Sequence, residues 1–223
     1  MKYKLIESSK LFYNKYTCKV VIWNSLAGIF RSKNYTHAKK QLDLLQQSAE
    51  AGAPLQNPAR VYSKWVTFEH FQDACVLYEH IKRDTHDYLI RVEGFELVIY
   101  ANDEEWLERL INMVDVIEYH KPRDEEHKTF LLANKNLVIH NKPVPYEYQV
   151  YLPDTCPIIF ANFIKANIDK LKIGRQCLYN LEHETYMSGL YFWVRDEKVL
   201  HLAQIACGNK FKKIIRHIYQ PKD

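Results

Sequence analysis

Glycine and long apolar runs are scarce in this sequence, and their scarcity excludes several classes of protein. Only 6 of the 223 residues are glycine, and they are too scattered to form the loops that cradle nucleotide phosphates. Neither a G-x-x-x-x-G-K-[ST] nor a G-x-G-x-x-G pattern occurs. No segment approaches the roughly 18 uninterrupted apolar residues of a membrane helix. We therefore expect neither nucleotide hydrolysis nor dinucleotide redox chemistry, and no membrane partner.

Metal-ligand patterns are also missing. The cysteines are Cys18, Cys75, Cys156, Cys177 and Cys207. They are odd in number, widely spaced and without a C-x-x-C pair, so neither a disulfide framework nor a zinc site is expected. A group of metal-capable side chains follows one predicted helix: His80, Asp84, His86 and Asp87. Its spacing fits no known ligand set and is typical of a solvated loop. With no apolar leader near the start, we predict a cytoplasmic protein without metal or cofactor.

Positive charge is concentrated at the two ends of the chain. Residues 1–50 hold nine Lys or Arg against three Asp or Glu, and residues 201–223 hold five against one. Residues 101–150 hold six against ten, and the whole chain carries +4. A basic surface built from both ends would suit a polyanion, although charge scattered over a solvated surface would give the same counts.

Apolar periodicity predicts a similar series of elements in each half of the chain. In the first half we expect a strand over 11–23, helices over 34–50 and after 67, a hairpin at Glu93-Gly94, a helix after Asp103 and a strand over 116–119. The charged run 123–128 is expected to be a linker. In the second half we expect a strand over 145–152, a helix from 157 to 174, strands over 176–181 and 190–195, a helix after Asp196 and a strand over 211–219.

The two series form an internal repeat. Gly94 and Gly189 each precede a third strand, and Asp103 and Asp196 each cap a last helix. Strand–helix–strand–strand–helix–strand is the ferredoxin-like arrangement, with two helices on one face of an antiparallel sheet. We therefore predict an α+β protein of two tandem ferredoxin-like (βαββαβ) units, over 1–128 with an extra helix and over 129–223. This layout resembles tandem RRM-like proteins.

Basic and aromatic residues interleave at both chain ends. Phosphates attract cations and unpaired bases stack on flat rings, so the mixture suits RNA or single-stranded DNA. The alternative is that the aromatic residues face the core and the lysines face water. The candidate binding residues here are Lys10, Lys15, Lys19, Arg31, Lys33, Lys39, Lys40, Lys210, Lys212, Lys213 and Arg216. Alternation along a strand is expected to place Lys15 and Lys19 on one sheet face, and likewise Lys210, Lys212 and Arg216.

Tyr191 and Trp193 are two further candidates for nucleic-acid binding. They alternate along one predicted strand with Arg195, so all three share a face. In RRM-like proteins the corresponding central strand carries stacking aromatic residues, although the basic-Gly-aromatic signature is absent here. An interface between the two halves is the competing interpretation.

His37 is the one histidine that we consider as a catalyst. It lies at the predicted start of a helix, near Lys33, Tyr35 and Lys39. This arrangement in a tandem ferredoxin-like chain resembles the CRISPR repeat-processing endoribonucleases, although their glycine-rich loop is absent. The resemblance implies a general acid–base role for His37, with a lysine stabilising the phosphorane.

Three functional hypotheses follow, in order of preference. The first is a non-catalytic nucleic-acid-binding protein that uses the chain ends. The second is a protein-interaction adaptor or inhibitor that uses a sheet face or the acidic helix at 103–108. The third is a metal-independent endoribonuclease.

Overall fold

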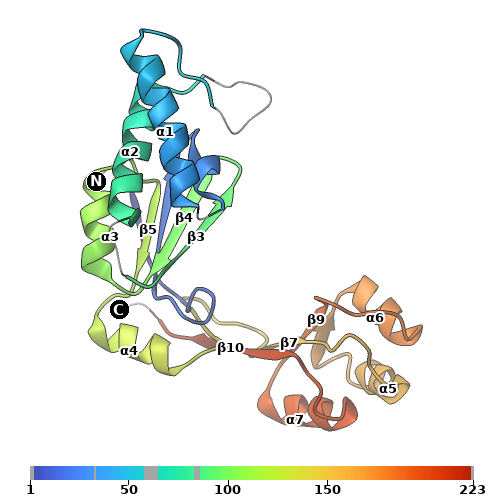
Figure 1. The fold of residues 1–223 in the computed structure, drawn as a ribbon. Coiled ribbons are helices and arrows are strands. Elements are labelled where there is room, and N and C mark those ends of the chain that lie inside the picture. Colours follow the sequence, from blue (N-terminus) through green and yellow to red (C-terminus); the bar gives the residue numbers. More distant parts are fainter. Residues whose placement is uncertain (1–2, 33, 58–64, 83–85, 222–223) are drawn as a thin grey trace. The chain divides into compact units, whose positions relative to one another are not determined.

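The chain forms two α+β units, each with its own sheet and core (Figure 1). The computed structural model describes residues 3–32, 34–57, 65–82 and 86–221. The compact units are Met1–Ala133 and Asn134–Asp223. No helix within these described ranges is long and apolar enough to cross a membrane.

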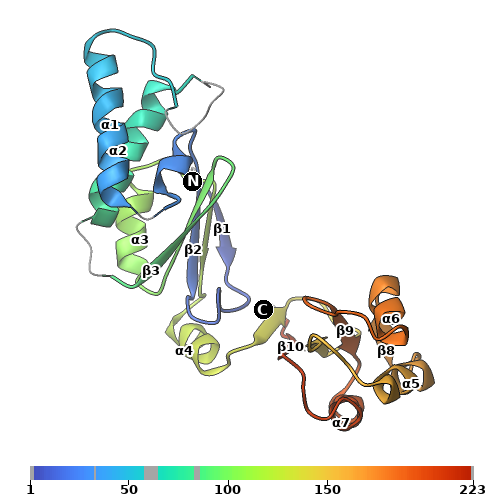
Figure 2. The ribbon, with the colours of Figure 1, turned by 45° about the vertical axis from the view of Figure 1, so that its right-hand side comes forward.

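The first unit contains a five-stranded sheet. Its elements are strands Lys4–Glu7 (β1) and Cys18–Trp23 (β2), the 3-10 helix Ala27–Phe30 (η1), helices Tyr35–Glu50 (α1) and Phe68–Lys82 (α2), strands Tyr88–Glu93 (β3) and Glu96–Ala101 (β4), helix Glu104–Ile111 (α3), strand Glu118–Lys121 (β5) and helix Glu125–Ala133 (α4). The strand order is β1-β5-β2-β4-β3. Helices α1, α2 and α3 lie on one side of the sheet (Figure 2).

The second unit has the same sheet topology. Its elements are strands Leu137–His140 (β6) and Tyr148–Tyr151 (β7), helix Ile158–Ala166 (α5), strand Leu171–Ile173 (β8), helix Arg175–Glu182 (α6), strand Tyr191–Val194 (β9), helix Glu197–Ala206 (α7) and strand Lys213–Tyr219 (β10). The strand order is β6-β10-β7-β9-β8.

Both sheets therefore contain the ferredoxin-like order of four antiparallel strands, which confirms the predicted fold class. In the first unit these are β5-β2-β4-β3, and in the second β10-β7-β9-β8. Each unit adds one strand that pairs in parallel with the last strand, β1 with β5 and β6 with β10. The repeat thus extends one strand further than the sequence predicted.

The equivalent helix starts are confirmed. The Asp103 carboxylate accepts a hydrogen bond from the Trp106 amide at 2.9 Å, and the Asp196 carboxylate accepts one from the Val199 amide at 2.9 Å. Each cap satisfies a backbone N–H that the first helical turn leaves unpaired. Gly94 supplies the positive φ, 62°, that the tight turn between β3 and β4 requires.

The predicted strand over 176–181 is wrong, because these residues belong to α6. Cys177 and Leu181 are both buried and stand four residues apart, which places them on one face of a helix. The second of the four ferredoxin-like strands in this unit is instead β8, which occupies the end of the helix predicted over 157–174. The second unit consequently has an extra helix of its own.

The charged run 123–128 is not a linker. The Asp124 side chain accepts the His127 amide at 2.7 Å and starts α4, which extends to Ala133. The boundary that was expected after residue 128 lies inside this helix, whereas the division into compact units follows Ala133.

The predicted long strand over 11–23 is interrupted. Phe12 and Tyr16 pair across a turn in which Tyr13 and Asn14 have φ values of 54° and 55°. The regular strand β2 begins only at Cys18. Lys15 therefore lies in the turn and does not share a sheet face with Lys19, contrary to the expected alternation.

Candidate nucleic-acid interface

The second sheet has one face that packs against the helices of its unit and one face that none of these helices covers. Val150, Phe192 and Val194 are fully buried in the core of the unit. The alternate residues Tyr151 and Trp193 must point to the opposite face. Tyr191 shares that face, and 42% of its surface is exposed. We call this side of the sheet the aromatic face, defined by Tyr151, Tyr191 and Trp193.

The rings of the aromatic face form a continuous row across two central strands. Tyr151 on β7 is the register partner of Tyr191 on β9, and their ring centroids lie 5.4 Å apart. Tyr191 and Trp193 follow at 6.2 Å, edge to face. In the register, Trp193 stands between Gln149 and Lys172. The row is thus flanked by polar groups rather than enclosed by apolar ones.

Two histidines extend this row toward the edge strand. The His217 ring lies 4.7 Å from Trp193 and 5.1 Å from His140. His140 Nε2 and His217 Nδ1 are 2.8 Å apart, so one imidazole donates a hydrogen bond to the other. This bond links β10 to β6 on the helix-free side and orients the ring next to Trp193.

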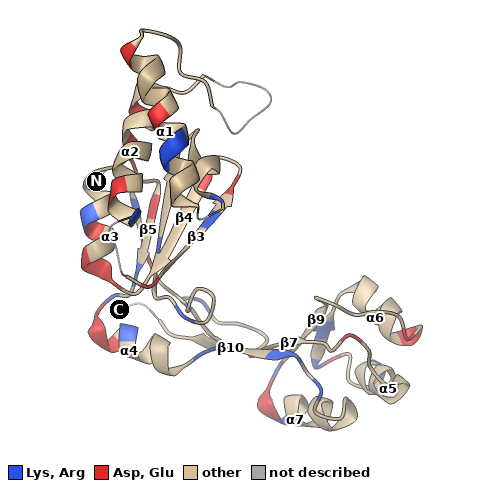
Figure 3. Ribbon diagram, viewed as in Figure 1, with Lys and Arg blue, Asp and Glu red and all other residues tan. Residues whose placement is uncertain are grey.

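The charge of the aromatic face is positive. The strands β6 to β10 contain no Asp or Glu (Figure 3). By register, Lys213 stands beside Tyr151 and Lys172 beside Trp193, while Arg195 directly follows β9. The Glu147 amide, just before β7, donates a hydrogen bond to the Arg195 carbonyl, and the Glu147 carbonyl accepts one from the His217 amide. Alternation directs the Glu147 carboxylate to the same face. Three cations thus stand against one carboxylate.

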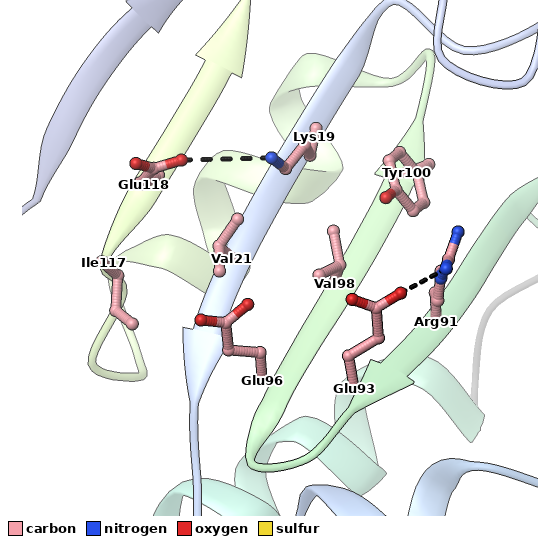
Figure 4. A pocket seen from close by; sticks show the side chains of 9 residues that line it. All are labelled: Lys19, Val21, Arg91, Glu93, Glu96, Val98, Tyr100, Ile117 and Glu118. Atoms are coloured by element: carbon pink, nitrogen blue, oxygen red, sulfur yellow. Dashed lines mark ion pairs between the residues drawn. The ribbon is translucent and has the colours of Figure 1, made fainter. Parts of the chain in front are cut away.

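The first sheet has a helix-free face of different chemistry. Its residues line a hollow of about 460 Å³ with Val21 and Val98 in the floor. The side chains above this floor carry both signs of charge (Figure 4). They include the carboxylates Glu93, Glu96 and Glu118 as well as Lys19 and Arg91. We call this the mixed-charge face.

The cations of the mixed-charge face are already paired with carboxylates. Arg91 forms an ion pair with Glu93, and Lys19 Nζ lies 4.0 Å from the Glu118 carboxylate. His120 Nε2 also lies 3.0 Å from Glu118, and this hydrogen bond holds the pKa of the Glu118 carboxyl below its usual range. Burial lowers the pKa of His120 itself. The face therefore keeps its negative charges at neutral pH and does not suit a phosphate backbone.

The turn at 12–16 packs against the mixed-charge face. Phe12 lies 5.6 Å from the Tyr100 ring and 5.8 Å from His120, and Tyr13 lies 5.0 Å from Tyr100. Tyr16 is buried. Aromatic residues that the sequence offered for stacking on bases here pack on the sheet of their own unit. Burial also raises the pKa of the Tyr100 hydroxyl to about 12.

Several of the predicted N-terminal cations are engaged in ion pairs. Lys15 Nζ lies 2.5 Å from Asp87, and Lys39 Nζ lies 2.9 Å from Asp43. Hydrogen bonds to these carboxylates raise the pKa of both lysines. The exposed cations Lys10, Arg31 and Lys40 have no ion pair within the described ranges. Lys33 lies outside the described residues.

The predicted C-terminal cations do not form one row. Lys210 and Lys212 precede β10, and Lys212 Nζ lies 2.5 Å from Asp154. Arg216 points to the side of the sheet opposite the aromatic face and lies over the Tyr148 ring at 5.9 Å. The expected alternation of Lys210, Lys212 and Arg216 along one strand is therefore wrong. Lys213 alone of this group belongs to the aromatic face.

His37 lies in the exposed first turn of α1, and its backbone amide donates to the Asn34 side chain at 2.9 Å. The neighbouring groups that could assist it are engaged elsewhere. The Tyr35 hydroxyl is hydrogen-bonded to that of Tyr88, and Lys39 is paired with Asp43. The described residues thus place none of these groups in contact with the His37 ring.

The metal-capable group after α2 is also divided among separate partners. His80 stacks on Trp106 at 4.8 Å, while His86 pairs with Asp103 at 3.0 Å. Asp87 pairs with Lys15, and Asp84 lies outside the described residues. Among the residues that are described, no three metal-binding side chains converge.

Of the residues on or beside the aromatic face, Tyr191, Trp193 and Lys213 are predicted from the sequence as candidates, whereas Tyr151, Lys172 and the two histidines are not. Tyr151 alternates with the apolar Val150 in a strand that the sequence predicts, so its place on the opposite face could have been inferred. Lys172 could not be placed on this face from the sequence, because β8 falls at the end of the helix predicted over 157–174. No protein-family model, curated protein or solved structure matches this chain. Its class therefore rests on its own fold and surface, those of a two-unit ferredoxin-like protein with an aromatic, basic sheet face.

Proposed function

We propose that this protein binds single-stranded nucleic acid, RNA or DNA, on the aromatic face of its second unit, without catalysing a reaction. The row of Tyr151, Tyr191 and Trp193 carries the proposal. Unpaired bases stack on such rings, with about 1–3 kcal/mol per base. The cations beside the rings supply the phosphate attraction that single strands require.

The arrangement supports a short binding site. The row from Lys213 through Tyr151 and Tyr191 crosses three neighbouring strands, which lie about 4.8 Å apart. Three rings accommodate two or three stacked bases, and Lys172 and Lys213 stand on opposite sides of them. Because rings accept any base and lysine reads only charge, we expect weak sequence preference and strong salt dependence.

Binding of a fluorescent oligonucleotide, followed by anisotropy, tests this proposal. Loss of two stacking rings in the double variant Tyr191→Ala, Trp193→Ala should weaken binding by at least about 30-fold. Trp23→Ala is the matched control, since it removes an exposed tryptophan of the first sheet, and it should leave binding unchanged. Equal affinity of the double variant and the parent protein, or no binding by the parent at low salt, would contradict the proposal.

A second candidate function is the binding of a basic protein segment by the first unit. A groove of about 730 Å³ contains five carboxylates and two lysines of the α3–α4 region. Lys121 and Lys128 pair with Glu108 and Glu104, at 2.9 Å and 3.4 Å, which leaves the groove with a negative balance. Pull-down of basic peptides, lost in Glu105→Lys and retained in Tyr191→Ala, would favour this function over nucleic-acid binding.

The endoribonuclease hypothesis is tested in the same mixtures. Labelled RNA is incubated with the protein in EDTA and its length is followed on a gel. We expect intact RNA, because the groups beside His37 are engaged elsewhere. Cleavage that disappears in His37→Ala while binding persists would instead assign catalysis to that histidine.

A further inference from the structure

Two buried cysteines of the second unit are in contact. The Sγ atoms of Cys156 and Cys207 lie 3.9 Å apart, although 51 residues separate them in the sequence. Cys156 belongs to the connection between β7 and α5, and Cys207 is the C-cap residue of α7. Cys156 is 9% exposed and Cys207 is 1% exposed. The pair thus lies just beneath the surface, at the ends of regular elements.

We propose that Cys156 and Cys207 are an oxidation site, at which a peroxide converts the two thiols into a reversible intramolecular disulfide. A disulfide has an S–S bond of about 2.05 Å, so the sulfur atoms must approach by roughly 2 Å. Rotation about the side-chain bonds, with a small shift of the connection that carries Cys156, achieves this movement. The inference does not depend on nucleic-acid binding.

The environment favours Cys207 as the thiol that reacts first. The hydrogen bond between the two sulfur atoms, with help from the backbone amide of Lys210, lowers the pKa of Cys207. The same hydrogen bond and burial raise the pKa of Cys156. Cys207 therefore gives up its proton more readily than Cys156, and the thiolate is the reactive form of cysteine.

The reaction balances with hydrogen peroxide as the oxidant. The Cys207 thiolate attacks one peroxide oxygen, the O–O bond breaks, and the products are a sulfenic acid and hydroxide. The Cys156 sulfur then attacks the sulfenic sulfur. The S–O bond breaks, the S–S bond forms, and the Cys156 proton leaves with the hydroxyl group as water. The proton that Cys207 lost joins the hydroxide of the first step. The two thiols together lose two electrons, and one hydrogen peroxide is reduced to two water molecules.

The other cysteines lack these features. Burial raises the pKa of Cys177 to about 11 and that of Cys18 to about 12, and it also raises the pKa of the half-buried Cys75. Among the five, all within the described ranges, only the Cys156–Cys207 pair has two sulfur atoms in hydrogen-bond contact. We therefore expect a single, specific disulfide.

Peroxide treatment of the folded chain, residues 1–223, tests the inference. Titration of thiols after denaturation should give five before treatment and three after it, and dithiothreitol should restore five. Trypsin separates the relevant cysteines into peptides 136–165, 176–195 and 199–210. Mass spectrometry should find peptides 136–165 and 199–210 joined, with the loss of two hydrogen atoms.

Two variants make the result specific. Cys75→Ser should still lose two thiols, whereas Cys207→Ser should lose none to an intramolecular disulfide. The oxidised protein should also melt at a higher temperature, because the cross-link restrains a loop of about 50 residues in the unfolded chain. Five thiols remaining after excess peroxide, separate sulfinic acids at the two positions, or a cross-link through Cys75 or Cys177 would overturn the inference. The peptide map of the unaltered protein decides the question even if a variant fails to fold.

Discussion

The two sheets share one strand order but expose different chemistry on their helix-free faces. The strands of the first sheet contain four glutamates, whereas those of the second contain none. Strand order depends on the main core of each unit, which is hydrophobic in both. The opposite face can differ, because its charged side chains lie outside that core. The comparison illustrates that function belongs to a surface placed on a fold and not to the fold itself.

The units differ also in what packs on these faces. In the first, Phe12 and Tyr13 of the N-terminal turn pack on Tyr100. In the second, Tyr191 remains substantially exposed. Aromatic content alone therefore does not identify a binding surface, since the same ring type serves as packing in one unit and as candidate stacking surface in the other.

The largest expected effect concerns the separate cores. Trp106→Ala in the first unit and Phe160→Ala in the second each remove a fully buried ring, which typically costs 3–5 kcal/mol of the free energy of unfolding. Amide hydrogen exchange of the full chain should accelerate mainly in the unit that carries the substitution. Equal acceleration in both units would show that they unfold as one.

The next effect concerns the charge difference between the faces. Lys172→Glu combined with Lys213→Glu makes the aromatic face acidic, and oligonucleotide affinity should fall by about 10-fold or more at 100 mM salt. The slope of log K against log salt should become shallower by about 1.4, or about 0.7 for each lost phosphate contact. The control, Lys4→Glu with Lys19→Glu in the first unit, should bind like the parent. Similar losses in both variants would show that binding does not distinguish the faces.

The helix caps test how far the two units are equivalent. Asp103→Ala and Asp196→Ala each remove the hydrogen bond to an amide in the first helical turn, and each should lower the free energy of unfolding by about 1 kcal/mol. Asn or Ser at either position should recover most of the loss. Chemical denaturation measures both. If only one of the two substitutions lowers the free energy of unfolding, the two units share their strand order but not the stabilising role of this helix cap.

A smaller effect is expected from Glu147, the one carboxylate that we place on the aromatic face. Glu147→Gln eliminates that charge and should tighten oligonucleotide binding by about 2- to 5-fold at low salt, with the gain shrinking as salt rises. Glu96→Gln on the mixed-charge face is the matched control and should have no effect. Weaker binding by Glu147→Gln would mean that this carboxylate does not face the ligand.

The smallest effect is a pH dependence in the first unit. Burial lowers the pKa of His127, whose Nδ1 accepts a hydrogen bond from the Arg123 amide at 3.2 Å. The folded protein therefore keeps this ring neutral, while the unfolded chain takes up a proton near its ordinary pKa of about 6.5. Stability should be fully present above pH 6.5 and should fall as the pH drops below it.

Asparagine at position 127 can accept the same hydrogen bond without titrating. His127→Asn should therefore show a smaller loss of unfolding free energy between pH 7 and pH 5 than the parent. His201→Asn, at an exposed position of the second unit, should leave the pH profile unchanged. A parent profile that is flat, or identical to that of His127→Asn, would contradict this assignment.

Much of the fold could be predicted from local patterns in the sequence. The hairpin at Glu93-Gly94 and the capped helices after Asp103 and Asp196 depend on residues within a few positions of one another. Alternation along a strand likewise placed Tyr191 and Trp193 on one face. The repeated order of such local signals was sufficient to predict two ferredoxin-like units.

Only the tertiary structure decided which surface combines these residues. Lys172 stands beside Trp193, and Tyr151 beside Tyr191, because of strand register, which joins residues 21 to 40 positions apart. Long-range packing also brings Asp87 to Lys15, and this ion pair neutralises a cation that the sequence offered for phosphate binding. The sequence by itself determined the elements and the alternation of their side chains, because both follow from neighbouring residues. Register and ion pairing depend on long-range packing, so the position of the candidate site could be seen only in the folded chain.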